Sequence, residues 1–449
     1  MRRWDLVELR VWVEPSGPRP VVCELRDLRQ GRDDPLWTRH YWASDFGISD
    51  HLGDASLRMP IDLRRAVAQA LTERFAGRAL LWLHLLAPYG QLAAVPWERE
   101  IISAARTPVV RLPEPLPAAA APAVLWRLGV ILNAPAGAFW PTSYLPRLTE
   151  ALTRAVKMPI EVHAFCDAAT AEALSQNTPT PGLRIHRPPM VTSEGPTADR
   201  WRNWLCERLA DQGLRALYIA GDGRCEGDRP RIAVAIDPAL PYEPGHCGYL
   251  TGGDIRRLAD RLGAPAVGIG STPGNPCELA NRLLADEVGV GQCGPTAYVD
   301  VAADSWGRGL AAAQAFLANP PGSTPLPIDA GLFAYVQPTL LESVLAEPWP
   351  RTSTSVDPSL TAQLSPGFLL EQEYVERGEE VPGWVASSAR YLDYTLVDQN
   401  RFGGTGGQAL AKSAFAQGRA RARSFIQDLL VEHADKKEPT GPNSAASQP

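Results

Sequence analysis

The sequence predicts an α/β protein whose second half forms a mostly parallel sheet covered by helices. From residue 127 on, short apolar runs typical of buried strands alternate with segments of helical periodicity. Alternation at this spacing is typical of a parallel sheet with helices on both faces. The chain has 449 residues, of which 45% are hydrophobic and 21% charged, so it can bury a large core. We therefore expect a soluble globular protein of two or three domains.

The first part of the chain is predicted to be rich in strands. Residues 4–13 alternate polar and apolar, and a second such run at 20–25 follows a turn of Pro and Gly residues, so a hairpin is the simplest interpretation. Residues 63–74 carry apolar side chains at helical spacing, and they precede a buried strand at 79–86. The Pro- and Ala-rich run at 112–123 indicates a linker.

The regular alternation begins after this linker. The predicted strands are 127–133, 160–165, 182–188, 214–221, 264–270 and 295–302. The predicted helices are 145–156, 169–176, 197–212, 251–263, 277–288 and 307–318. Ligands gather in such folds at the carboxyl ends of strands, where the loops GDGRCEGD (221–228) and GSTPGNP (270–276) stand.

These patterns divide the chain into four parts. We expect an N-terminal strand-rich part at 1–118, an α/β domain at 119–345, a helical extension at 346–433 and a polar tail at 434–449. The tail is expected to be disordered because it is polar and lacks apolar periodicity. Two helices around a Gly-rich break at 403–407 are expected in the extension.

Charge and hydropathy exclude two classes of partner. The formal net charge is −6 and no cluster of Lys and Arg stands out, which argues against a nucleic-acid-binding surface. No run of eighteen apolar residues occurs, and the N-terminus lacks the apolar stretch of a secretory signal, so we expect no membrane association. The sequence therefore predicts a cytoplasmic location.

Cysteine spacing and glycine patterns predict neither a metal nor a cofactor. The seven cysteines are scattered without a C-x-x-C pair, as expected in a reducing compartment. The pattern G-x-G-x-x-G at 289–294 precedes a strand, whereas a dinucleotide fingerprint must follow one. The run at 403–413 has Ala411 in place of the glycine that comes before the lysine of a phosphate-binding loop.

One segment carries a resemblance to a known family. The predicted strand at 79–86 runs through WLHLLAPYGQLAAVPWERE into the short motif Pro96-Trp97-Glu98. This segment resembles the N-terminal signature of CHAT-domain proteins, which are caspase-like cysteine peptidases of bacteria. The resemblance covers about residues 1 to 345 in organisation. It implies a caspase-like three-layer fold with a mostly parallel sheet, preceded by the β-rich N-terminal part and followed by the C-terminal helices.

The resemblance also indicates where a catalytic pair would stand. In that family one strand ends in Gly-His-Gly, which supplies the catalytic histidine, and the next-but-one strand ends in Ala-Cys, which supplies the nucleophile. This chain has Gly221-Asp222-Gly223 at the first position and Gly270-Ser271 at the second. Their separation is comparable with the about 50 residues by which a caspase histidine precedes its cysteine.

The substituted pair predicts an inactive site. Caspase-type hydrolysis needs a thiolate nucleophile and an imidazole that moves its proton near neutral pH. A carboxylate such as Asp222 is too weak a base to take the proton of a serine hydroxyl, and Ser271 without a base is almost inert. We therefore expect no catalytic residues, and a pseudopeptidase that acts through protein contacts in a bacterial signalling or defence system. In that interpretation Asp222 is free to hold an arginine of a partner.

Two alternatives remain open. The active site can be relocated to His246 with Cys277 or Cys225, since catalytic groups are recognised by geometry and not by sequence position. The chain would then be a caspase-like endopeptidase. Alternatively, the C-terminal helices carry the function as a scaffold, because their Arg419, Arg421 and Arg423 lie among apolar residues typical of a partner-binding helix.

Overall fold

A computed structural model describes residues 3–346 with short gaps. The gaps are 14–20, 30–33, 49–56, 87–88, 113–123, 136, 177–178, 191–193, 210–211, 227–228, 276, 292–294, 305–306, 319–330, 337–340 and 342–343. The expected C-terminal helices and tail, from residue 347 on, lie outside the described residues.

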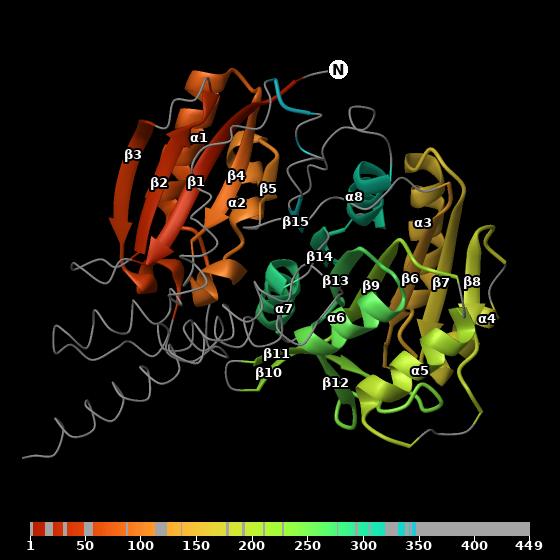
Figure 1. The fold of residues 1–449 in the computed structure, drawn as a ribbon. Helices are drawn as coiled ribbons and strands as arrows, with labels where there is room; N and C mark the ends of the chain where they lie inside the picture. Colours follow the sequence, from red (N-terminus) through yellow and green to blue (C-terminus); the bar gives the residue numbers. More distant parts are fainter. Residues whose placement is uncertain are drawn as a thin grey trace, which may run out of the picture.

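One large sheet runs through the described part of the protein (Figure 1). Its 12 strands lie in the order β3-β2-β1-β4-β5-β15-β14-β13-β9-β6-β7-β8. Most neighbours are parallel; the antiparallel pairs are β1 with β2, β2 with β3, and β14 with β15. The predicted α/β class with a mostly parallel sheet is confirmed.

The N-terminal part supplies five strands of this sheet. Its elements are β1 (Asp5–Val13), β2 (Val21–Asp27), β3 (Asp34–Tyr41), α1 (Ile61–Phe75), β4 (Ala79–Leu85), α2 (Trp97–Ala105) and β5 (Val109–Arg111). The expected hairpin is β1 with β2. The sequence did not predict β3, because this edge strand is largely half-buried or exposed and so carries a weak apolar alternation.

The α/β part follows the predicted alternation. Its elements are β6 (Trp126–Leu132), α3 (Trp140–Ala155), β7 (Ile160–Cys166), α4 (Ala168–Ser175), β8 (Leu183–His186), α5 (Thr197–Leu209), β9 (Ala216–Gly221), β10 (Gly223–Glu226), β11 (Arg229–Val234), β12 (Gly248–Thr251), α6 (Gly252–Arg261), β13 (Ala266–Ser271), α7 (Glu278–Gly291), β14 (Thr296–Asp300), α8 (Arg308–Ala318) and β15 (Leu332–Tyr335). The short strands β10, β11 and β12 form a separate antiparallel sheet in a region for which the sequence predicted loops.

Strand order places a topological switch in this part. The chain runs outward from β6 to β7 and β8, then returns to the other side of β6 and runs through β9, β13 and β14. In open α/β sheets, ligands bind outside the carboxyl ends of strands near such a switch. The loops that follow β9 and β13 lie at this edge.

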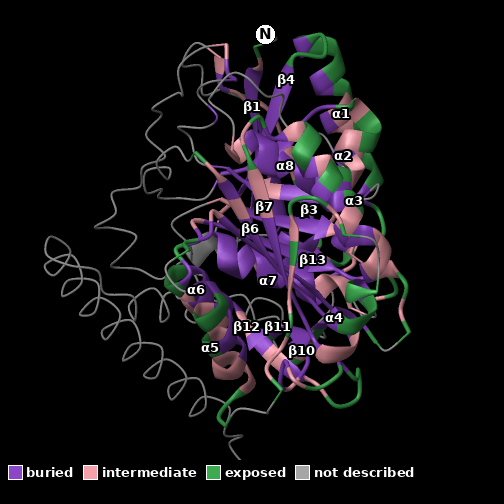
Figure 2. Cartoon of the chain, turned by 90° about the vertical axis from the view of Figure 1, so that its right-hand side faces the viewer, coloured by how far each residue is buried: buried purple, intermediate pink, exposed green. Residues whose placement is uncertain are grey.

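Helices cover both faces of the α/β part. Side chains of α5, α6 and α7 pack with β9 and β13 in one apolar cluster, and side chains of α3, α4 and α8 pack in another on the opposite face. A third cluster joins α1 and α2 to the N-terminal strands. Figure 2 shows the resulting buried interior and the exposed outer faces of the helices. No described helix is long and apolar enough to cross a lipid bilayer.

Candidate functional site

The ends of three neighbouring strands define the candidate site. In the sheet register Ser271, the last residue of β13, pairs with Gly221 at the end of β9 and with Asp300 at the end of β14. Because these strands are parallel, the residues that end them meet at one edge of the sheet. Asp222 and Ser271, which the sequence singled out, are therefore neighbours.

Packing explains the two glycines that flank Asp222. A Cβ at Gly221 would lie 2.6 Å from the carbonyl oxygen of Ala233, and one at Gly223 would lie 2.5 Å from the carbonyl oxygen of Cys277. Both distances are too short for any side chain, so β11 and the start of α7 require glycine here. The Gly-Asp-Gly sequence thus meets a packing requirement on both sides of the carboxylate.

The carboxylate of Asp222 is half-buried and held by two hydroxyl groups. Tyr242 donates its phenolic OH to Oδ2 at 2.9 Å, and Thr272 donates its hydroxyl to Oδ1. Burial and the charge of Asp222 raise the pKa of Tyr242, which stays a donor. No arginine or lysine among the described residues forms an ion pair with Asp222. A carboxylate accepts about four hydrogen bonds, so it retains acceptor capacity.

The hydroxyl of Ser271 is buried and surrounded by donors. Only 2% of the residue is exposed. Its Oγ accepts hydrogen bonds from Asn275 Nδ2 at 3.1 Å, Asn281 Nδ2 at 3.1 Å and the Tyr298 OH at 3.0 Å. Burial raises the pKa of Tyr298, so the phenol stays protonated and cannot serve as a base. The lone pairs that a nucleophile would use are engaged, and no base is in contact.

Asn281 ties β9 and β13 together beneath the site. Its Nδ2 also donates to the carbonyl oxygens of Gly221 at 2.8 Å and Gly270 at 3.2 Å, and the residue is fully buried. These acceptors determine which atom of the amide is nitrogen. Asn281 was not predicted from the sequence, where its only signal is one amide inside the apolar face of the helical segment CELANRLLADEV.

A tight turn follows Ser271. The N–H of Asn275 donates to the carbonyl of Thr272 at 3.1 Å, Pro273 occupies the second position and Gly274 has φ +78°. This is a type II turn, which favours Pro at its second position and needs a positive φ at its third. Asn275 Oδ1 then accepts the backbone N–H of Gly223 at 3.1 Å and that of Cys277 at 3.0 Å. The turn thereby links the two loops of the site.

The alternative catalytic candidates do not form a cysteine–histidine pair. His246 is exposed in the loop before β12, and no hydrogen bond joins it to Cys277 among the described residues. Cys277 instead contacts Cys225 of β10 through a thiol–thiol hydrogen bond. Two other histidines lie buried in strands: His84 of β4 meets Glu8 Oε1 at 2.6 Å, and His163 of β7 meets His186 at 2.9 Å.

The Pro96-Trp97-Glu98 motif lies in the core at the start of α2. Pro96 precedes the helix, and the buried indole of Trp97 donates to the carbonyl of Leu92 at 2.8 Å. Glu98 Oε1 accepts from Arg111 Nε at 2.8 Å, and Oε2 accepts from Arg282 at 3.2 Å. Burial by itself lowers the pKa of Arg111, but the charge of Glu98, its hydrogen bond and the charge of Asp286 act in the opposite direction and raise the pKa overall.

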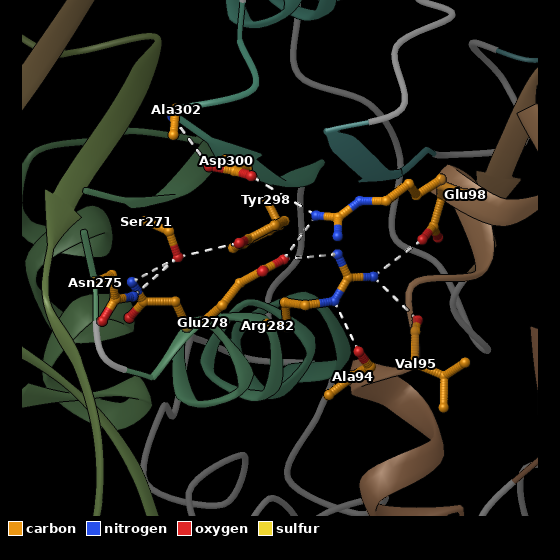
Figure 3. Close-up of polar contacts among 12 residues, drawn as sticks. Ala94, Val95, Glu98, Ser271, Asn275, Glu278, Arg282, Tyr298, Asp300 and Ala302 are labelled. Carbon is orange, nitrogen blue, oxygen red and sulfur yellow. Dashed lines mark hydrogen bonds and ion pairs between the residues drawn. The ribbon is translucent and has the colours of Figure 1, made fainter. Parts of the chain in front are cut away.

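A chain of contacts connects this motif to Ser271 (Figure 3). Arg282 of α7 donates to the carbonyls of Ala94 at 2.8 Å and Val95 at 3.0 Å, and its guanidinium lies 5.1 Å from the ring centroid of Tyr298. Tyr298 in turn reaches the hydroxyl of Ser271. The motif therefore holds α7, the helix that carries Asn281, through the contact of Glu98 with Arg282.

Charged side chains form a rim beside Ser271. Arg99 of α2 lies 3.2 Å from Glu278 and 3.7 Å from Asp300, and the side chains of Arg99 and Glu278 are 41% and 38% exposed. Among the described residues no group of three or more His, Cys, Asp or Glu is arranged to hold a metal ion.

Comparison of the chain with protein-family models, curated proteins and solved structures found no match.

Proposed function

We propose that this chain is a caspase-like protein of the CHAT type that lacks peptidase activity and acts by binding a protein partner in bacterial signalling or defence. Two features support the family assignment. The strand order β7-β6-β9-β13-β14 brings the ends of β9 and β13 side by side, and Asp222 and Ser271 lie there, at the positions for which the resemblance implies a histidine and a cysteine. The proposal places the protein in the cytoplasm, where free thiols persist.

The surroundings of Ser271 carry the argument for inactivity. A serine nucleophile needs a base within hydrogen-bond reach, such as an imidazole. The groups that reach its Oγ are two amides and a phenol, and the hydroxyl is buried. An amide nitrogen cannot accept a proton, so this arrangement stabilises the strand ends and does not activate an oxygen.

Asp222 supports the binding role. Its carboxylate is half-buried at the strand edge, is oriented by Tyr242 and Thr272, and has no cationic partner among the described residues. Arginine donates two parallel hydrogen bonds to a carboxylate, which makes it the side chain that fits best. We infer that a partner presents an exposed arginine to this edge.

A labelling experiment tests the absence of peptidase activity. The purified full chain is incubated with a bacterial lysate, and new protein N-termini are labelled and identified. We expect the same termini as in the lysate alone. New termini that disappear with Ser271→Ala would show a working serine, and new termini that disappear with Cys277→Ala would show the relocated peptidase. One observation favours the relocated peptidase: the pKa of the Cys277 thiol is lowered, chiefly by a hydrogen bond from Cys225.

A gain-of-function variant tests the equivalence of the two positions. The double variant Asp222→His with Ser271→Cys restores an imidazole and a thiol at the ends of neighbouring strands. Because residue 271 is buried, the readout is the ultraviolet absorbance of the thiolate against pH, which needs no reagent to reach the sulfur. We expect the thiol at position 271 to ionise at lower pH in the double variant than in Ser271→Cys alone, because a neighbouring imidazolium stabilises a thiolate. Identical titration of the thiol in the two folded variants would contradict the caspase-like assignment.

Peptide binding tests the role of Asp222. Pools of fluorescent octapeptides with one position held as Arg or as Gln are titrated against the full chain. We expect the Arg pools to bind more tightly than the Gln pools. Asp222→Asn should raise the Kd of the Arg pools about tenfold, which corresponds to a loss of about 1.4 kcal/mol of binding free energy. The matched control is Glu243→Gln, which removes the same charge from an exposed side chain next to Tyr242. Equal weakening by both variants would contradict a specific arginine site.

A further inference from the structure

Two cysteines meet beside the candidate site. Cys225 lies in β10 and Cys277 immediately precedes α7, and the two thiols form a hydrogen bond. Both residues are free cysteines and half-buried, so reagents dissolved in water reach them. Neither residue takes part in the hydrogen bonds of Asp222 or of the Ser271 hydroxyl.

Strand geometry explains why these thiols face each other. A Cβ at Gly223 would point at the start of α7, because it would meet the Cys277 carbonyl at 2.5 Å and Ala280 Cβ at 3.0 Å. Side chains two residues apart on a strand share a face, so Cys225 points toward the same helix end. The side chains of Arg224 and Glu226 are exposed on the other face. The backbone therefore places the Cys225 side chain on the face of β10 that packs against α7, where it joins the same apolar cluster as Leu279 and Leu283.

The helix N-terminus stabilises a thiolate at Cys277. The N–H of Ala280, in the first turn of α7, donates to the carbonyl oxygen of Cys277 at 3.1 Å and also favours the charged form of the neighbouring sulfur. The hydrogen bond from Cys225, together with this N–H, lowers the pKa of Cys277 to about 6, although burial acts in the opposite direction. A thiolate is the form that attacks peroxides and disulfides.

We propose that Cys225 and Cys277 form a reversible disulfide when hydrogen peroxide is the oxidant. The thiolate of Cys277 attacks one peroxide oxygen, the O–O bond breaks, and a sulfenic acid and hydroxide result. The sulfur of Cys225 then attacks the sulfenic sulfur, displaces its oxygen as hydroxide and loses its own proton. This proton and the one that Cys277 released when it ionised convert the two hydroxides into two water molecules. Two thiols are oxidised and one peroxide is reduced.

The disulfide would join the two loops of the candidate site covalently. Cys277 N–H already donates to Asn275 Oδ1, which also accepts from Gly223 N–H. A bond between β10 and the start of α7 would hold this turn against the strand end that carries Asp222. The inference concerns thiol chemistry alone and does not depend on the proposed function.

Peptide mass spectrometry of the full chain tests the proposal. The reduced protein is treated with a few equivalents of hydrogen peroxide, remaining thiols are alkylated, and peptides are mapped without reduction. We expect a mass loss of about 2 Da, a peptide pair linked through Cys225 and Cys277, and full reversal by dithiothreitol. In Cys225→Ala we expect a sulfenic acid at Cys277 that dimedone traps, because the resolving thiol is absent.

The matched control is Cys206→Ser, which removes another half-buried cysteine and should leave the linked peptide unchanged. Three results would overturn the proposal: both thiols still alkylated after peroxide treatment, a disulfide between other cysteines, or a sulfenic acid at Cys277 that persists in the unsubstituted protein. The first mapping needs no variant, so a variant that fails to fold does not affect the outcome.

Discussion

Replacement of Glu98 by glutamine tests the role of the Pro-Trp-Glu motif. Glu98 is 2% exposed and receives hydrogen bonds from two buried guanidinium groups, Arg111 at 2.8 and 3.3 Å and Arg282 at 3.2 Å. The next carboxylates are Glu278, 3.7 Å from Arg282, and Asp286, 3.8 Å from Arg111. The substitution keeps the shape of the side chain and removes its charge, so two buried cations would share less negative charge.

The expected loss follows from the cost of an uncompensated buried charge. Breaking a buried ion pair by removing one partner costs about 3–5 kcal/mol. Arg282 keeps its hydrogen bonds to Ala94 and Val95, and Arg111 keeps one to Ala93, which favours the lower end of this range. We expect Glu98→Gln to lower the free energy of unfolding by about 3 kcal/mol. Urea denaturation followed by tryptophan fluorescence measures it.

Glu100 of the same helix provides the matched control. Its side chain is 22% exposed and lies 2.5 Å from Arg64, whose side chain is 40% exposed. An ion pair of this kind contributes about 0–1 kcal/mol, so Glu100→Gln should have a small effect. If Glu98→Gln loses no more stability than Glu100→Gln, the buried network does not hold α2 against α7, and the reasoning above is wrong.

Three further predictions concern the sheet and its edge. Burial, followed by the charge of His163, lowers the pKa of His186 to about 4, so the unfolded chain binds protons more tightly below pH 6.5. The free energy of unfolding should therefore fall by about 1 kcal/mol between pH 7 and pH 5; this value allows for solvent screening of the half-exposed ring. In His186→Gln the urea midpoint should depend less on pH over this range. Asn281→Leu should lower the free energy of unfolding by about 2–4 kcal/mol in urea denaturation, since it removes the donor that Nδ2 supplies to two buried carbonyls and to the Ser271 hydroxyl. The disulfide between Cys225 and Cys277 closes a loop of about 50 residues and should raise the free energy of unfolding by up to about 4 kcal/mol, and an unchanged denaturation midpoint after peroxide would contradict this.

The order and type of most elements followed from local patterns. Strand and helix periodicities depend on which side chains face the core, and the alternation from β6 to β14 was long and regular enough to predict a mostly parallel sheet. The short strands β3 and β10 to β12 carried no such signal. They are short or partly exposed, and their pairing depends on neighbours elsewhere in the chain.

The chemistry of the site depended on distant segments. Glycines on both sides of Asp222 are visible in the sequence, but their reason is the close approach of Ala233 and Cys277. The donors around Ser271 come from positions 4, 10 and 27 residues further along, and the thiol partner of Cys277 comes from β10. Sequence alone therefore determined that a carboxylate and a hydroxyl end two parallel strands. Tertiary structure decided that the hydroxyl is buried without a base, because hydrogen bonds and burial at a strand end are supplied by segments that only folding brings together.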